Sequence, residues 1–298
     1  MMIESSDKFD NRNLANKTPE LALSLETLRY GADMESYQKT VLENAGNDYD
    51  VLRRQLTDLR SVWYPETEYA ILRNGSGWVL TAKGASNNES HNHNDVGSCM
   101  IYINAKPIIV DPGIGSYTKN TFGPNRYKEW CMRSGWHNLP VINGQIQKNG
   151  PEFRAVNSLC DTRRNVFSTE IQKAYPDSAA CTRWQRQYLL TGSAVKIVDN
   201  YILESRLAPD VVNFIVMGDV EVSGKHLVIT GYTHDRKDSV KVRLAYSPTL
   251  TPSIEEMPLN DSKLEQRWNS KTIRRITFTS APDAPLSGSY EFVFTTNN

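Results

Sequence analysis

The chain has 298 residues, of which 39% are hydrophobic and 23% are charged, enough apolar material for one large domain or for a domain with a smaller appendage. Its 34 basic and 34 acidic residues balance to zero net charge, so neither nucleic acid nor an anionic membrane is favoured as the main partner. No apolar run reaches the roughly 18 residues of a transmembrane helix, and the polar N-terminus lacks the apolar core of a secretory signal.

Residues 1–60 carry helical patterns. Thr18-Pro19-Glu20 resembles an N-cap followed by Pro at the first helical position, and regularly spaced apolar residues follow it. Two further short helices are predicted before residue 60. Three short helices bury too little apolar surface to form an independent domain, so we expect residues 1–60 to be a helical segment that packs on something else.

From residue 61 onward, short β-type runs alternate with Gly, Asn, Asp and Pro. Many short strands without helical patterns between them predict a large antiparallel β-sandwich over residues 61–298, so the chain is mainly β. In Trp184–Leu190, apolar and polar residues alternate as in a strand with one wet face. The predicted strands are Tyr69–Arg73, Trp78–Ala82, Ser98–Ile103, Pro107–Val110, Leu139–Ile142, Ala179–Leu190, Val195–Leu203, Val212–Met217, His226–Ile229, Val240–Ala245, Thr272–Phe278 and Tyr290–Phe294.

The most informative stretch is the polar run from Ser90 to Gly97, which contains His91 and His93 out of only five histidines in the chain. In an extended segment, residues two apart point to the same side, so both imidazoles would face one locus. That arrangement suits metal binding, or one metal ligand beside one acid–base group. Two surface histidines in a polar loop are an equal alternative on this pattern alone.

A predicted hairpin follows this run. Ser98–Ile103 and Pro107–Val110 are joined by a tight turn at residues 104–106, and pairing around it returns Asp111 towards the end where the two histidines lie. The register places Asp111 opposite Cys99, so contact with a histidine requires the polar loop to curl back. An aspartate before Pro-Gly is also a common turn former.

A third histidine, His137, lies between an aromatic residue and an asparagine, where a lone histidine is more often a packed residue than a ligand. Together, His93, Asp111 and His137 form a chemically sensible set. Two neutral imidazoles and a carboxylate suit Zn²⁺ and leave a fourth position for water or substrate.

The other candidate groups show no such pattern. His226 and His234 lie among late strands and turns, and we expect both to be structural or surface residues. Glu255-Glu256 is interpreted as part of a solvated loop. The four cysteines lack the paired spacing of zinc sites and are expected to be buried free thiols: Cys99, Cys131, Cys160 and Cys181.

The ordered runs SHNHNDVGS, PIIVDPGIGSYT, NRYKEW and RSGWHNLPVINGQIQ resemble the β-sandwich domain of the heparinase II/III-like polysaccharide lyases. The resemblance covers roughly Pro65 to Leu203. It implies a large N-terminal α/α toroid followed by antiparallel sheets, with the catalytic cleft between them. Residues 1–60 then resemble the last helices of such a toroid.

The resemblance also implies residue roles. His93, Asp111 and His137 match the family's zinc ligands, and His91 matches a cleft histidine implicated in proton transfer. These enzymes cleave beside a uronic acid by β-elimination, in which a base removes the C5 proton and an acid protonates the leaving oxygen. The zinc is expected to organise the site rather than to act in the reaction.

Tyr117, Arg126 and Tyr127 lie close to these motifs in sequence and are candidate substrate-binding residues. Neither tyrosine is predicted to be the general base, because a tyrosine in a β domain is usually a packing residue. The family's catalytic tyrosine, and the residue that neutralises the uronate carboxylate, come from the toroid. The isolated chain is therefore predicted to have little or no lyase activity.

The leading hypothesis is thus the C-terminal portion of a lyase that degrades a heparin- or heparan-like or another acidic polysaccharide, and the resemblance implies a periplasmic or secreted bacterial protein. One alternative is a non-catalytic carbohydrate-binding or structural β-sandwich that keeps the metal, with Trp130, Trp136 and Tyr127 stacking on sugars. Another is a metallohydrolase that uses zinc-bound water, for which the sequence offers no obvious general base.

Overall fold

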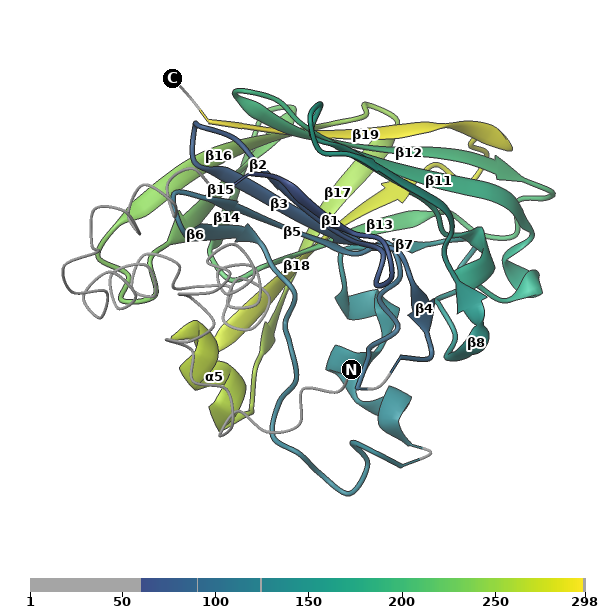
Figure 1. The fold of residues 1–298 in the computed structure, drawn as a ribbon, viewed down its shortest axis with the longest axis horizontal. Helices are drawn as coiled ribbons and strands as arrows, with labels where there is room; N and C mark the ends of the chain where they lie inside the picture. The colour runs from purple at the N-terminus through teal and green to yellow at the C-terminus, as the bar shows by residue number, and fades with distance from the viewer. Residues whose placement is uncertain (1–59, 90, 124, 297–298) are drawn as a thin grey trace. The chain divides into compact units, whose positions relative to one another are not determined.

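The computed structural model describes residues 60–296 apart from residues 90 and 124 (Figure 1). The chain divides into two units, residues 1–60 and 61–298. The helices predicted before residue 60 lie outside the described residues, so the division into a helical segment and a β domain stays a prediction. The second unit consists mainly of antiparallel β-sheet, which confirms the predicted fold class.

The first sheet has five strands in the order β1-β2-β3-β5-β6. Its inner strands carry nearly continuous runs of buried residues, so neither face of these strands is open to solvent. The bounds are β1 (Val62–Tyr64), β2 (Tyr69–Arg73), β3 (Trp78–Lys83), β5 (Cys99–Ile103) and β6 (Lys106–Ile109).

The largest sheet has eight strands in the order β14-β15-β16-β19-β12-β11-β10-β9. On β11, Trp184, Arg186, Tyr188 and Leu190 are buried and the residues between them are more exposed, so the predicted alternation is confirmed. The bounds are β9 (Val156–Asp161), β10 (Val166–Glu170), β11 (Cys181–Leu190), β12 (Ala194–Leu203), β14 (Asp219–Ser223), β15 (His226–Tyr232), β16 (Ser239–Tyr246) and β19 (Ser287–Thr296).

A third sheet has the order β17-β18-β13-β7, and a small sheet pairs β4 with β8. The α-helix α5 (Ser262–Trp268) joins β17 to β18. Among the described residues, no helix is both long enough and apolar enough to cross a bilayer. The remaining bounds are β4 (Ser86–Asn87), β7 (Pro140–Val141), β8 (Gly150–Arg154), β13 (Val211–Val216), β17 (Leu250–Pro258), β18 (Thr272–Ser280), and the 3-10 helices η2 (Arg126–Lys128), η3 (Trp130–Met132), η4 (Ser134–Trp136), η5 (Gln172–Ala174) and η6 (Asp177–Ala179).

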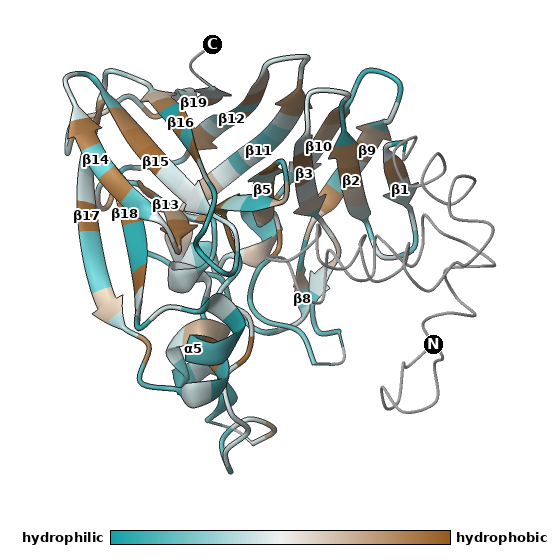
Figure 2. Ribbon diagram, turned by 90° about the vertical axis from the view of Figure 1, so that its left-hand side faces the viewer, coloured by the Kyte–Doolittle hydropathy of each residue, from teal (hydrophilic) through white to brown (hydrophobic). Residues whose placement is uncertain are grey.

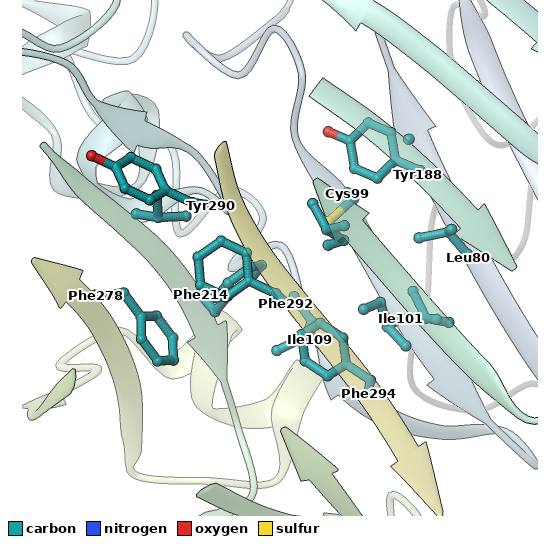
Figure 3. Packing of buried hydrophobic residues seen from close by; sticks show 14 of the residues in the cluster. Leu80, Cys99, Ile101, Ile109, Tyr188, Phe214, Phe278, Tyr290, Phe292 and Phe294 are labelled. Carbon is teal, nitrogen blue, oxygen red and sulfur yellow. The ribbon is translucent and has the colours of Figure 1, made fainter. Parts of the chain in front are cut away.

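One hydrophobic core connects the three larger sheets (Figure 3). Leu80 comes from the first sheet, Tyr188 and Phe292 from the second, and Phe214 and Phe278 from the third. The ring of Phe214 meets the ring of Phe292 edge-on at a centroid distance of 4.9 Å. Figure 2 shows hydrophobic bands along the strands, whereas the loops beneath them near α5 are largely hydrophilic. Of the four free cysteines, Cys99 and Cys131 are buried and the other two are only partly buried.

Several strands were missed by the sequence patterns, among them the polar strand β17 and the short apolar strand β1. Glu255 and Glu256 lie on β17 and not in the loop that their neighbours indicated, and β17 is an edge strand of the third sheet. Glu255 pairs with Arg275 at 2.5 Å, and Glu256 pairs with Arg274 at 2.7 Å. Cross-strand ion pairs replace apolar contacts on this exposed strand, so it lacks the hydrophobic run by which strands are recognised.

Candidate metal centre and active site

Three side chains from separate loops converge beside the first sheet. Ligand atoms of His93, Asp111 and His137 all lie within 4.8 Å of one another. His137 Nδ1 is 2.8 Å from Asp111 Oδ2, and the rings of His93 and His137 are 5.2 Å apart between centroids. His137 is fully buried, whereas the other two are partly exposed. The cluster therefore has one closed side and one side open to solvent.

The β5–β6 hairpin places Asp111. Asn104 and Ala105 both have left-handed backbone angles, with φ of 48° and 61°, as a two-residue turn of this kind requires. Ile101 pairs with Ile109, and regular pairing ends there, two residues before Asp111. The carboxylate thus projects from the end of the hairpin.

The polar loop before β5 does curl back towards this end. The amide of Gly97 donates to the carbonyl of Lys83 at 2.9 Å, and the amide of Ser98 donates to the carbonyl of Asp95 at 2.9 Å. The amide of Asn94 donates to the carbonyl of Met132 at 3.0 Å and ties the loop to the segment that leads to His137. These backbone bonds place His93 next to the other two residues.

Asn138 fixes the two neighbouring segments to each other. Its side-chain nitrogen donates to the carbonyl of Cys99 at 2.7 Å and to that of Val110 at 2.9 Å. Its side-chain oxygen accepts from the amide of Ile215 at 2.7 Å. The residue after His137 therefore binds the carbonyl of the residue before Asp111, which keeps the buried imidazole and the carboxylate in register.

A buried ion pair on neighbouring strands of the largest sheet supports two of the loops that carry the cluster. Arg186 and Asp199 are fully buried, and Arg186 Nη2 donates to Asp199 Oδ2 at 3.2 Å. The same guanidinium donates to the carbonyls of Gly97, at 3.3 Å, and Asn138, so it holds two of the three loops of the candidate site, those of His93 and His137. Trp184 Nε1 donates to Asp199 Oδ1 at 2.9 Å. The alternation along β11 indicates only which face of the strand Arg186 occupies. It does not reveal that Arg186 binds the loops of the site.

The charges in the cluster depend on one another. Burial lowers the pKa of His93 to about 4, and the neighbouring His137 acts in the same direction. Burial raises the pKa of Asp111, but the charge and hydrogen bond of His137 outweigh it and hold this pKa well below its ordinary value. Burial lowers the pKa of His137, but Asp111 outweighs it and raises this pKa above 6.5. At neutral pH the cluster therefore offers an ionised carboxylate and a neutral His93.

This donor set fits a divalent cation. His137 Nε2 is buried and has no hydrogen-bond partner among the described residues, which is costly for a polar atom unless something binds it. Two imidazoles and a carboxylate are ligands that zinc prefers. The three side chains are consequently suited to hold an ion such as Zn²⁺ with a position left open.

His91 departs from the sequence expectation. Its φ is 62°, so the backbone is not extended at His91 and the two histidines do not share a side by strand geometry. His91 is exposed, and its ring meets that of Phe122 edge-on at a centroid distance of 5.3 Å. A left-handed residue other than glycine is strained, and such strain is concentrated at functional sites.

Two of the three candidate substrate-binding residues are linked to the loop of His91, Tyr117 through the ring of Phe122 and Arg126 by a hydrogen bond. The side chain of Tyr117 is 60% exposed. Arg126 Nη2 donates to the carbonyl of Asn92 at 2.7 Å, and its guanidinium lies 6.0 Å from the ring centroid of Tyr127. Arg126 thus holds the loop between His91 and His93. Phe122, which sequence reasoning missed, carries no signal beyond being an aromatic residue in a polar loop.

Two tryptophans considered for sugar stacking pack on each other instead. The ring centroids of Trp130 and Trp136 are 5.1 Å apart. Trp136 is only 6% exposed, and the guanidinium of Arg275 covers its ring at 4.6 Å from the centroid. Trp136 is therefore a packing residue of the η4 segment and offers no free face to a ligand.

The described domain is thus an antiparallel β-sandwich with a candidate His–Asp–His metal site at the rim of its sheets. The family model described as "Heparinase II/III-like, C-terminal" matches residues 57–244. The chain belongs to the heparinase II/III-like family, through its C-terminal domain. No curated protein sequence matched the chain.

Solved structures share the fold at low sequence identity. The "Heparinase III-BT4657 gene product" has a TM-score of 0.65 at 14% identity, with 87% of this chain and 42% of that chain covered. The heparan sulfate lyase HepC from Pedobacter heparinus has a TM-score of 0.64 at 13% identity, with 97% and 42% covered. A further structure of heparinase III has a TM-score of 0.54 at 18% identity, with 78% and 36% covered. The chain thus spans less than half the length of these structures.

Proposed function

We propose that this chain is the C-terminal portion of a polysaccharide lyase that cleaves a uronic-acid-containing glycan by β-elimination. The observation that carries the proposal is the convergence of His93, Asp111 and His137 at the sheet rim with His91 two residues from one of them. Family membership supports it, as do structural neighbours named as heparinase III and as a heparan sulfate lyase. An acidic, heparin- or heparan-like glycosaminoglycan is the substrate class that these names favour.

In this proposal His93, Asp111 and His137 hold a zinc ion. When bound, the ion supplies positive charge and a rigid link between the three loops that carry its ligands. The chain's own residues do the positioning. Because His93 is fixed by the cluster, the short strained connection to His91 is fixed as well, and the His91 imidazole stays at the exposed rim.

His91 is proposed to transfer a proton in the elimination. In that reaction a base takes the proton from C5, the C4–oxygen bond breaks, a C4–C5 double bond forms, and the departing oxygen is protonated. Histidine suits such transfers near neutral pH. Tyr117, Arg126 and Tyr127 are proposed to contact the sugar. The partner tyrosine and the group that neutralises the uronate carboxylate are proposed to lie in the toroid of a full-length parent.

We further propose that the parent works in the bacterial periplasm or outside the cell. Large acidic polysaccharides are extracellular polymers, and one structural neighbour is a heparan sulfate lyase of a bacterium. Cell fractionation with an antibody against the β domain tests this, and recovery of the protein only with cytoplasmic markers would contradict it.

The test of the proposed function separates the metal from the chemistry. In the full-length protein, His93→Ala and Asp111→Ala should lose bound zinc and unfold at lower denaturant concentration, because metal binding is coupled to folding. His91→Ala should keep the zinc and the stability while turnover falls about 10²- to 10⁴-fold, the usual contribution of a general acid or base. Elemental analysis, urea titration and the ultraviolet absorbance of unsaturated uronate are the three measurements.

His226→Ala, at the start of β15, is the matched control and should change none of these properties. Absence of metal from protein purified without added metal would contradict the ligand assignment. Normal turnover by His91→Ala would contradict its role in proton transfer. If the full-length protein binds acidic glycan without turning it over, the non-catalytic carbohydrate-binding alternative is correct.

A further inference from the structure

Two large aromatic side chains stand exposed beside His91. Tyr117 is 60% exposed and Phe122 is 63% exposed, and their rings meet at a centroid distance of 5.3 Å and an angle of 63°. Phe122 also meets the ring of His91 at 5.3 Å. His91, Phe122 and Tyr117 therefore form a continuous series of rings, which we call the aromatic row.

The loop between the two aromatic residues is closed by its own hydrogen bonds. The amide of Thr118 donates to Thr121 Oγ1 at 2.8 Å, and the amide of Thr121 donates to the carbonyl of Thr118 at 3.1 Å. The amide of Gly123 donates to the carbonyl of Asn120 at 3.1 Å. Thr121 is buried, so it anchors the loop. The two rings are thus presented by an ordered loop and are organised before any ligand arrives.

Helix α5 fixes the start of this loop. Asp261 caps the helix by accepting from the amides of Lys263 and Leu264, each at 3.0 Å, through one carboxylate oxygen. Its other oxygen accepts from the amide of Ser116 at 2.8 Å, across 145 residues of sequence. The same aspartate therefore ties the helix N-terminus to the residue before Tyr117.

The last turn of α5 is bound to the same segment. Arg267 Nη1 donates to the carbonyl of Ile114 at 3.1 Å, and Trp268 Nε1 donates to the carbonyl of Pro112 at 3.1 Å. The helix is consequently held along the chain between Asp111 and Tyr117. Its position relative to the aromatic row is set by three separate hydrogen bonds.

This docking brings positive charge to the row. Lys263 Nζ lies 4.8 Å from the ring centroid of Tyr117, and the guanidinium carbon of Arg126 lies 5.9 Å from that of Phe122. Lys263 is exposed, and within the described part of the chain it forms no ion pair. An anion at this position would meet one cation at each aromatic side chain.

We propose that the aromatic row is a sugar-binding subsite for an acidic glycan, with Lys263 and Arg126 meeting its carboxylate or sulfate groups. The proposal rests on the proposed function and extends it to Phe122 and to Lys263 of α5. Exposed aromatic rings cost solvation free energy unless a partner covers them, and the C–H face of a sugar ring suits a flat aromatic surface. The rigid rings also lose little conformational entropy when they bind. Contact with His91 places the subsite next to the proposed proton transfer.

Calorimetry of the 298-residue chain tests this with two probes, a heparin octasaccharide and the uncharged maltooctaose. We expect the heparin octasaccharide to bind and maltooctaose to bind at least about tenfold more weakly. Phe122→Ala, Tyr117→Ala and Lys263→Gln should each raise the Kd for heparin at least about fivefold, as truncation of a central contact does. The effect of Lys263→Gln should shrink in 1 M salt, where charges are screened.

Matched controls remove similar groups elsewhere. Leu159→Ala deletes a side chain that is 69% exposed on β9, and Lys241→Gln removes an exposed charge on β16. Both should leave the Kd unchanged, and Phe122→Tyr, which keeps the ring, should retain affinity. Native affinity in Phe122→Ala and Tyr117→Ala would overturn the subsite, as would equal binding of the two probes or no binding by the unaltered chain.

The outcome is separable from that of the proposed function. Native heparin affinity in Phe122→Ala, combined with loss of turnover in the full-length His91→Ala protein, would overturn the subsite and leave the lyase function standing. Weakened binding in Phe122→Ala, combined with normal turnover by His91→Ala, would support the subsite and contradict the proton-transfer role.

Discussion

At the residue scale, the candidate metal cluster is a set of coupled charges. Asp111 stabilises the protonated form of His137 and raises its pKa, whereas burial lowers the pKa of His93 to about 4, so that His93 stays neutral above that pH. Zinc binds the neutral imidazoles and the ionised carboxylate, so any proton on the cluster competes with the metal. The two histidines should therefore affect metal affinity in different pH ranges.

We predict a two-stage pH dependence of zinc affinity. From above pH 6.5 down to about 4, one proton on His137 must be displaced, so the Kd for zinc should rise about tenfold for each unit by which the pH falls. Below about pH 4, His93 also binds a proton and the slope should approach two. Competition with a chromophoric chelator measures the Kd across the range.

A separate titration checks the cause. In metal-free protein, nuclear magnetic resonance should show His137 titrating above 6.5, and Asp111→Asn should move that pKa down because it removes the stabilising charge. A pH-independent zinc affinity between pH 4 and 6.5 would contradict the proposed proton competition.

At the scale of elements, β11 is connected to the loops of the site by the hydrogen bonds of Arg186. We predict that Arg186→Met lowers the free energy of unfolding by about 3–5 kcal/mol, because it leaves the Asp199 charge buried without a partner. It should also weaken zinc binding, since the carbonyls of Gly97 and Asn138 lose their shared donor. Urea titration and zinc competition are the measurements.

Arg183→Met on the same strand is the control. Its side chain is 43% exposed and pairs with Glu170 at 3.0 Å, so its loss should cost no more than about 1 kcal/mol. The double variant Arg186→Met with Asp199→Leu should recover part of the lost stability, because it removes the unpaired buried charge. Equal effects of Arg186→Met and Arg183→Met would show that the buried pair has no special role.

At the scale of the whole molecule, the chain spans about two fifths of the lyase structures that it resembles. If further catalytic groups lie outside these 298 residues, as proposed, the chain should bind zinc normally but turn over acidic glycan at least about 10²-fold more slowly than a full-length parent. Ultraviolet absorbance of the unsaturated product measures both rates. Comparable rates would place the complete catalytic machinery within this chain.

The sequence by itself determined the sheet-rich class and most buried strands, because alternating or continuous apolar runs such as Tyr69–Arg73 report local burial. It also indicated His93, Asp111 and His137 as a set, because their motifs occur in an order that resembles one family. Polar edge strands such as β17 escaped it, since their stability comes from cross-strand ion pairs.

Only the tertiary structure decided which side chains meet. The left-handed backbone at His91 means that it does not share a strand face with His93, and α5 brings Lys263 to Tyr117 across the fold. Arg186 likewise reaches the loops of the site from a distant strand. Such contacts depend on how sheets and loops pack against one another, and a periodic pattern along one segment carries no information about that packing.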